Sequence, residues 1–203
     1  HYDHLMDVPW IARNRAPRAR VYGSATIRHT LLGDPELDPS RLVAVEEDQV
    51  GSPEREGSWH HTPDGRVRFM ALAADHAPHL LGVRLYSGQE EGPRAALPQR
   101  AHEWLDGPTL AWLVDFLDEE GQVLLRVHYQ DAASEPPLGF PPGSLLPPDG
   151  RKVDLTILCV AGSGEADGYP EALLRALEPS VVLLGHWEDF FRPLRLPVRP
   201  VPG

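Results

Sequence analysis

Short apolar segments, each bounded by Gly, Pro or charged residues, run along the whole of this 203-residue chain. Over residues 4–14 the apolar positions recur at helical spacing, which predicts a helix with Pro9 in or near its first turn. Residues 20–24 read as a short strand that enters a tight turn. Ser24 can then cap a helix that ends near Leu32.

The rest of the chain predicts mainly strands and loops. Asp64-Gly65 is a strong turn signal for a β-hairpin. The segments 88–108 and 134–150 are rich in Gly and Pro, which predicts long irregular loops. The other expected elements are a helix at 170–177 and strands at 42–45, 67–72, 80–86, 110–117, 123–129, 153–160 and 181–185. Residues 110–117 and 123–129 flank the turn residues 118–121 and read as a hairpin, with a helix as the alternative for 110–117. Early hairpins followed by a strand–helix–strand order predict a mixed sheet covered by helices.

The composition limits the classes of partner. With 30 acidic against 19 basic residues the net charge is −11, which argues against nucleic acid and against an anionic membrane surface, because basic patches bind both. No apolar run approaches the roughly 20 residues of a membrane-spanning helix. The single cysteine, Cys159, excludes a disulfide framework. We expect a cytoplasmic protein, because secreted proteins usually carry disulfides.

The most informative segment is the opening one, His1-Tyr2-Asp3-His4. Two imidazoles and a carboxylate within four positions form a suitable donor set for a borderline cation such as zinc. The plain alternative is a polar segment without a metal. Another alternative is a copper chelate at a processed N-terminal histidine, which the lone cysteine argues against. We expect His1 to be internal to a longer protein.

Three further candidate ligands, His76, Asp131 and His186, come shortly after predicted strands. Loops at strand ends gather functional groups. Taken singly, each has an ordinary alternative, because a loop His is commonly a surface residue and an Asp after a strand commonly forms a turn. Together with the opening motif they repeat one pattern, a strand followed by a residue of metal-ligand type.

These motifs resemble those of the metallo-β-lactamase-fold hydrolases. His1-Tyr2-Asp3-His4 looks like the last four positions of the family signature H-x-H-x-D-H, whose first His would precede His1 by two residues. Asp75-His76, Tyr129-Gln130-Asp131 and Gly185-His186 look like the later family motifs, in the same order. Tyr22-Gly23-Ser24-Ala25-Thr26 and Val153-Asp154-Leu155-Thr156-Ile157-Leu158 resemble segments of the branch that includes the ascorbate-phosphate lactonase-like proteins.

The resemblance implies an α+β fold, a four-layer αβ/βα sandwich. Residues 1–203 would be the C-terminal larger part of a single domain that lacks its first strands. It also implies two divalent metal ions, zinc or alternatively manganese or iron, with Asp131 bridging them. One site would use the missing His with His1 and His76, and the other would use Asp3, His4 and His186.

The family mechanism would begin with a metal-held water whose pKa falls toward about 7. The resulting hydroxide would attack a carbonyl or phosphoryl centre in an ester, lactone or phosphodiester. Asp3 would orient this hydroxide as well as bind a metal. His79, Glu188 and Asp189 are candidates for supporting the ligands or touching a small-molecule substrate, and each has the alternative of an ordinary loop residue.

Two functions of other classes stay open. A catalytically silent module of the same fold would bind metal or a partner, although such modules usually lack ligands that this chain retains. An iron-containing redox variant would replace a ligand of the second metal site with a carboxylate, and no such carboxylate is evident. The missing strands also predict an open apolar surface. We expect an upstream segment, a companion chain or a homo-oligomeric partner to cover that surface.

Overall fold

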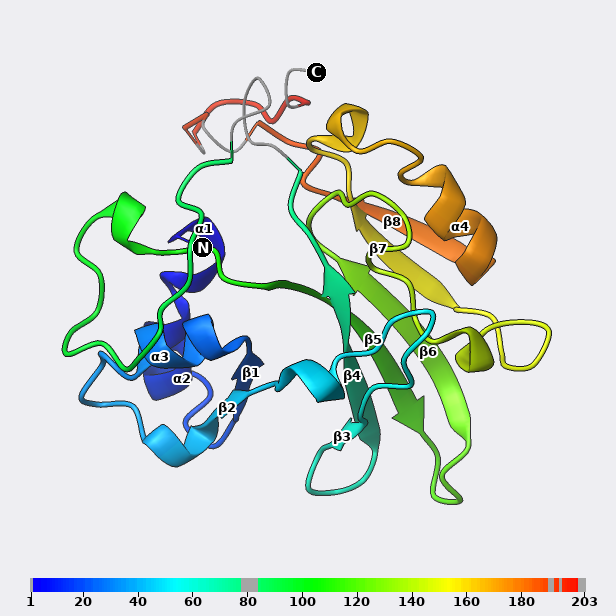
Figure 1. Cartoon of the computed structure of the whole chain (residues 1–203), viewed down its shortest axis with the longest axis horizontal. Coiled ribbons are helices and arrows are strands. Elements are labelled where there is room, and N and C mark those ends of the chain that lie inside the picture. Colours follow the sequence, from blue (N-terminus) through cyan, green and yellow to red (C-terminus); the bar gives the residue numbers. More distant parts are fainter. Residues whose placement is uncertain (1, 78–83, 190–191, 194, 201–203) are drawn as a thin grey trace. The chain divides into compact units, whose positions relative to one another are not determined.

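The computed structural model describes residues 2–77, 84–189, 192–193 and 195–200, and of Tyr2 and Asp3 it describes the backbone alone (Figure 1). The chain divides into two compact units. The first unit comprises residues 1–47 and 83–109, and the second comprises 48–82 and 110–203. The structure is mixed α+β. No helix in the described part of the chain is long and apolar enough to cross a membrane.

The first unit consists of short helices and a two-stranded parallel sheet. Its elements are α1 (Tyr2–Leu5), α2 (Val8–Asn14), β1 (Val21–Gly23), α3 (Ala25–Leu31), η1 (Pro39–Arg41), β2 (Leu42–Ala44) and η3 (Ala101–Glu103), where η denotes a 3-10 helix. Ser24 caps α3 as predicted, since its hydroxyl accepts a hydrogen bond from the Ile27 amide at 3.4 Å. Leu31, Leu42 and Trp104 lie in the core of this unit.

The structure corrects the single helix predicted over 4–14. Two separate helices, α1 and α2, form instead, with a turn at Met6 and Asp7. Pro9 explains the break, because it has no N–H to donate to the Leu5 carbonyl and its ring would clash with that carbonyl in a continuous helix. Pro9 lies in the first turn of α2, where its amide would have no helical partner in any case.

The second unit is built on a six-stranded sheet in the order β3-β4-β5-β6-β7-β8. Its elements are η2 (Glu47–Gln49, at the unit boundary), β3 (His60–His61), β4 (Val67–Ala74), β5 (Thr109–Leu117), β6 (Val123–Gln130), η4 (Gly143–Leu145), β7 (Leu155–Cys159), η5 (Ser163–Glu165), α4 (Glu171–Leu177) and β8 (Val181–Gly185). Strands β6, β7 and β8 are parallel, whereas β3–β4 and β5–β6 are antiparallel pairs. This arrangement confirms the predicted mixed sheet.

Side chains along these strands alternate between two faces of the sheet. One face forms the core, where Leu113 and Leu158 belong to one buried cluster with Leu173 of α4. The same face buries an ion pair in which Nε of Arg126 lies 2.7 Å from Oδ1 of Asp115. We call this buried face, against which α4 packs, the inner face of the sheet.

The opposite face of strands β5 to β8 carries apolar and aromatic side chains. The register aligns them in three rows: Phe116 with Leu125; Val114 with Val127, Leu155 and Val181; and Trp112 with Tyr129, Ile157 and Leu183. Exposure is high at Phe116 (42%), Val181 (57%) and Leu183 (54%). A contiguous exposed apolar patch usually marks an interaction surface. We call these three rows the outer apolar face.

The strand predicted over 80–86 is not found in its described part. Residues 80–83 lie outside the described residues, and Arg84 to Tyr86 lead into a turn. Tyr86 has φ 58°, whereas a strand needs φ near about −120°. The predicted loops at 88–108 and 134–150 are confirmed, and they contain only the short helices η3 and η4.

Candidate metal centre

Three neighbouring parallel strands of the second unit, β6, β7 and β8, end side by side. Asp131 directly follows β6, Cys159 is the last residue of β7, and His186 directly follows β8. The register pairs Cys159 with Gly185, so these strand ends are level. The carboxyl ends of parallel strands meet at one edge of a sheet, where α/β proteins commonly bind their ligands.

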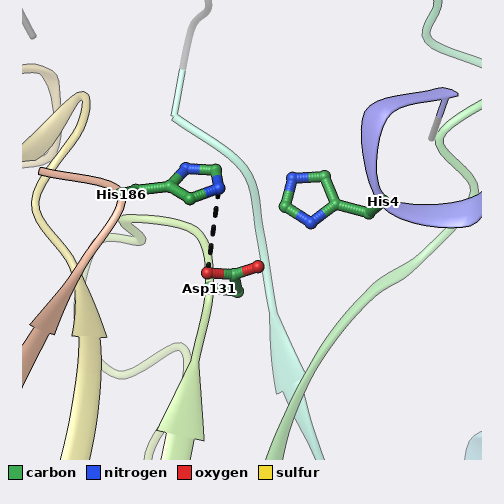
Figure 2. A group of neighbouring side chains, drawn as sticks. All are labelled: His4, Asp131 and His186. Atoms are coloured by element: carbon green, nitrogen blue, oxygen red, sulfur yellow. Dashed lines mark ion pairs between the residues drawn. The ribbon is translucent and has the colours of Figure 1, made fainter. Parts of the chain in front are cut away.

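Asp131 and His186 approach each other at this edge. Nε2 of His186 lies 4.0 Å from Oδ1 of Asp131, and Figure 2 shows the two side chains pointing toward one another. Both are half-buried, with 26% and 28% of the side chains exposed. This separation is too long for a hydrogen bond. Two atoms that bind the same zinc ion, each at up to about 2.2 Å, lie at most about 4.4 Å apart, so a separation of 4.0 Å is within that limit. The pair therefore fits a shared cation.

The backbone of His186 has an uncommon conformation, with φ 50° in the left-handed region. For a residue other than glycine, the left-handed conformation costs about 1 kcal/mol or more. Backbone strain of this kind gathers at functional sites. The turn directly after β8 brings the imidazole toward the end of β6, as Figure 2 shows.

The carboxylate of Asp131 makes its surroundings electrically negative. Burial and the charge of Asp131 raise the pKa of the Cys159 thiol to about 11. Burial, the same charge and a hydrogen bond to Asp131 raise the pKa of Tyr129. The pKa of Tyr169 is raised by burial and by the neighbouring Cys159 and Asp131. All three groups stay protonated near neutral pH, so none adds charge, and the carboxylate favours a cation.

His76 follows β4 by two residues and is half-buried. Its Nδ1 lies 2.7 Å from the Ala77 carbonyl oxygen. Because a carbonyl can only accept, Nδ1 carries the proton and the ring lone pair is on Nε2. Metal-binding imidazoles commonly have this arrangement, with one nitrogen donating to a carbonyl and the other binding the ion. The hydrogen bond from Nδ1 is therefore compatible with the predicted role of His76 as a metal ligand.

Within the second unit, the Asp131–His186 pair is incomplete as a metal site. Among the described residues of that unit, no third His, Cys, Asp or Glu has a ligand atom within 4.8 Å of both partners. Zinc sites in proteins use at least three protein ligands. The structure thus brings two predicted ligands together, and the role of His76 as a ligand stays a prediction.

The opening motif belongs to the first unit. His4, also labelled in Figure 2, lies in α1 with an exposed side chain. Asp3 lies in the same helix, and its side chain is outside what the structure describes. His1 and His79 lie outside the described residues altogether. The predicted roles of these four residues stay predictions.

Glu188 and Asp189 make contacts with the C-terminal segment. Nε and Nη2 of Arg199 donate to Oδ2 of Asp189 at 3.1 and 3.0 Å. Glu188 forms an isolated β-bridge with Pro200. These contacts hold both residues against the C-terminal segment. That either residue supports a metal ligand stays a prediction.

Several neighbours of Asp131 were not identified from the sequence. Cys159 is buried, and its position beside Asp131 follows only from the pairing of β6 with β7. Tyr129 could have been found, because strand alternation places it on the same side as Asp131 two residues later. No sequence signal indicates Tyr169, whose hydroxyl donates to the Cys159 carbonyl oxygen at 2.7 Å.

Comparison of the chain with protein-family models, with curated proteins and with solved structures finds no match. The resemblance to the metallo-β-lactamase-fold hydrolases therefore rests on the sequence motifs. The Asp131–His186 pair is a separate structural observation, made within one unit of the molecule.

Proposed function

We propose that this protein is a metal-dependent hydrolase with a dinuclear centre. The observation that carries the proposal is the approach of Asp131 and His186 to 4.0 Å at the ends of two parallel strands. Both residues belong to the predicted ligand set, although β7 separates their strands. The opening motif and His76 supply the other ligands.

The donor chemistry supports a divalent cation. The proposed set combines four imidazoles with two carboxylates, which suits zinc, with manganese and iron as alternatives. Burial and, after it, the charge of Asp131 raise the pKa of Cys159, and a cation at Asp131 would neutralise that charge. The half-buried position of the pair would keep such an ion within reach of a substrate. The residues present therefore fit the proposed metals.

When bound, the metals supply Lewis acidity for hydrolysis at a carbonyl or phosphoryl centre. The chain supplies position and orientation. Asp131 and His186 would hold a metal at the carboxyl edge of the sheet, and the left-handed backbone turn at His186 fixes the direction of its ring. Asp3 accepts a hydrogen bond from the attacking water and orients it. The substrate is a small ester, lactone or phosphodiester.

The proposal includes the four-layer αβ/βα sandwich. The inner face of the sheet is buried, whereas the outer apolar face is exposed. Two stacked sheets pack through alternate apolar residues of their facing strands, so a second sheet could pack on the outer apolar face. An upstream segment or a companion chain would provide that sheet. Association between copies of this chain is the alternative cover.

A catalytically silent metal-binding module is the second candidate. One observation favours it, since the described part of the second unit contributes two clustered ligands and no third. Such a module would bind zinc without hydrolysing a substrate. Metal content and turnover therefore have to be measured on the same samples.

The test measures zinc content and zinc affinity by competition with a chromophoric chelator, beside hydrolysis of lactone, phosphodiester and β-lactam substrates. The wild type should bind two ions and hydrolyse one of these classes. Asp131→Ala should lower zinc affinity at least about 10-fold and abolish turnover. Asp149→Ala, in an exposed loop of the same unit, is the matched control and should change neither.

Two outcomes would contradict the proposal. If Asp131→Ala keeps two ions and normal turnover, Asp131 does not bridge the metals. If the wild type binds two ions but hydrolyses none of the substrates, the silent module is the better description.

A further inference from the structure

Ser134 joins two segments at the carboxyl edge of the sheet. Its Oγ accepts a hydrogen bond from the Asp75 amide at 3.1 Å and donates to the Asp75 carbonyl oxygen at 2.6 Å. Close by, the Ala77 amide donates to the Ala133 carbonyl oxygen at 2.9 Å. These bonds attach the segment that follows β4 to the segment that follows β6. Ser134 is 3% exposed, so water does not compete strongly for its hydroxyl.

His76 lies between the two points of attachment, Asp75 and Ala77. Its amide donates to Oδ1 of Asp75 at 2.8 Å, and its ring Nδ1 donates to the Ala77 carbonyl oxygen at 2.7 Å. Both the backbone and the ring of His76 are therefore fixed to residues that are themselves attached to the segment after Asp131. The position of the imidazole depends on that attachment.

We infer that Ser134 is a positioning residue, whose hydroxyl fixes the segment of His76 onto the segment of Asp131. A hydroxyl suits this task because it can accept from an amide and donate to a carbonyl of the same residue. The hydrogen bonds between Ser134 and Asp75 are the evidence for this attachment. Its consequence for metal binding rests on the proposed function, in which His76 and Asp131 are both ligands.

The chain contains a matched control for this bridge. Oγ1 of Thr62 contacts both the amide and the carbonyl oxygen of Val67, each at 3.1 Å, at the start of β4. Thr62→Val removes a hydroxyl bridge at the end of β4 remote from His76. Ser134→Ala removes the same kind of bridge beside His76. The two variants separate a local effect on His76 from a general loss of a hydrogen-bonded hydroxyl.

The experiment has two measurements on the whole chain. Amide hydrogen exchange at Asp75 and Ala77, without metal, reports the attachment itself. Zinc affinity, measured with Zn²⁺ alone against a chromophoric chelator, reports its consequence. Ser134→Ala should accelerate exchange at both amides and lower zinc affinity about 10-fold, as expected for a residue that orients a ligand. Thr62→Val should leave both measurements at the wild-type level.

A double-variant comparison tests whether Ser134 acts through His76. His76→Ala should lower zinc affinity, and adding Ser134→Ala to it should lower the affinity no further. An additional loss in the double variant would overturn the positioning role, as would unchanged exchange in Ser134→Ala. Unchanged zinc affinity in Ser134→Ala, with the wild type binding zinc, would overturn the consequence for the metal. If the wild type binds no zinc, the proposed function fails, and hydrogen exchange alone decides the attachment.

Discussion

Nε2 of His186 lies 4.0 Å from Oδ1 of Asp131 although their strands, β8 and β6, are not neighbours. Strand β7 lies between them, and strands two positions apart are separated by about 9–10 Å. The two side chains therefore reach toward each other across the end of β7, where Cys159 lies. A pair held in this way can be tested without knowing the substrate.

The backbone and the imidazole of His186 can be separated by two substitutions. His186→Gly and His186→Ala both remove the ring and should lower zinc affinity at least about 10-fold. Glycine adopts φ 50° without strain, so the Gly variant should be more stable than the Ala variant by about 1 kcal/mol in urea unfolding without metal. His61→Ala, at an exposed position of β3, is the control for loss of a histidine. Wild-type zinc affinity in His186→Gly would contradict the proposed ligand role.

The thiol of Cys159 reports on the edge of the sheet that carries Asp131 and His186. Because it is 3% exposed and burial raises its pKa to about 11, we expect slow labelling by a disulfide reagent at pH 8 in the native protein. Zn²⁺ should slow labelling further, since an ion bound at the ends of β6 and β8 would suppress local opening of this edge. Asp131→Ala should remove this protection by zinc. Equal labelling rates with and without zinc in the wild type would argue against a metal at this edge.

His128 predicts a pH dependence of stability. The ring is fully buried, and burial lowers its pKa to about 4, against the donation of Nε2–H to the Gly139 carbonyl oxygen. The unfolded chain binds this proton near pH 6.5, so the free energy of unfolding should fall as the pH drops from about 6.5 to 4 and then level off. The loss should be as much as about 3 kcal/mol. Urea unfolding at several pH values in the presence of a chelator measures it.

The control for this pH dependence is His128→Gln, which keeps an N–H donor near Gly139 but does not titrate. It should reduce the slope of stability between pH 6.5 and 4. An unchanged slope in His128→Gln would show that other groups cause the dependence.

The buried ion pair of the inner face should contribute far more to stability than an exposed one. Asp115 is completely buried and accepts hydrogen bonds from Arg126 at 2.7 and 2.9 Å and from Arg68 at 3.0 and 2.8 Å. Asp115→Ala leaves the Arg126 charge buried without its partner and should cost about 3–5 kcal/mol in urea unfolding. Glu119→Ala removes the exposed partner of Arg66 and should cost less than about 1 kcal/mol. Similar costs for the two variants would contradict this account.

The outer apolar face predicts self-association of this chain. Leu183 is 54% exposed within that face, and we expect sedimentation velocity to show association at micromolar concentrations. Leu183→Glu should weaken it, because the added charge would be buried in the contact. Leu196→Glu, at a residue 41% exposed outside that face, is the matched control. A monodisperse wild-type monomer that unfolds cooperatively would contradict the prediction.

Much of the sheet could be predicted from the sequence. The turn residues at 118–121 predicted a hairpin of strands over 110–117 and 123–129, and β5 and β6 confirm both strands to within one residue at each end. Alternation is a local property, because successive side chains of a strand point to opposite faces. Alternation places His128 and Gln130 on the same face of β6, and the structure buries both. The single helix predicted over 4–14 was wrong, because Pro9 cannot continue a helix past the Leu5 carbonyl. The spacing of apolar residues does not reveal this effect.

The sequence by itself determined which residues stand at strand ends, including Asp131 and His186, because strand boundaries follow from local pattern. Only the tertiary structure decided that these two meet, since their approach depends on the register of β6, β7 and β8 and on the left-handed turn at His186. The attachment of Asp75 by Ser134 was likewise decided by the tertiary structure. Both contacts join segments far apart in the chain, and burial of the whole inner face selects the strand pairing that brings them together.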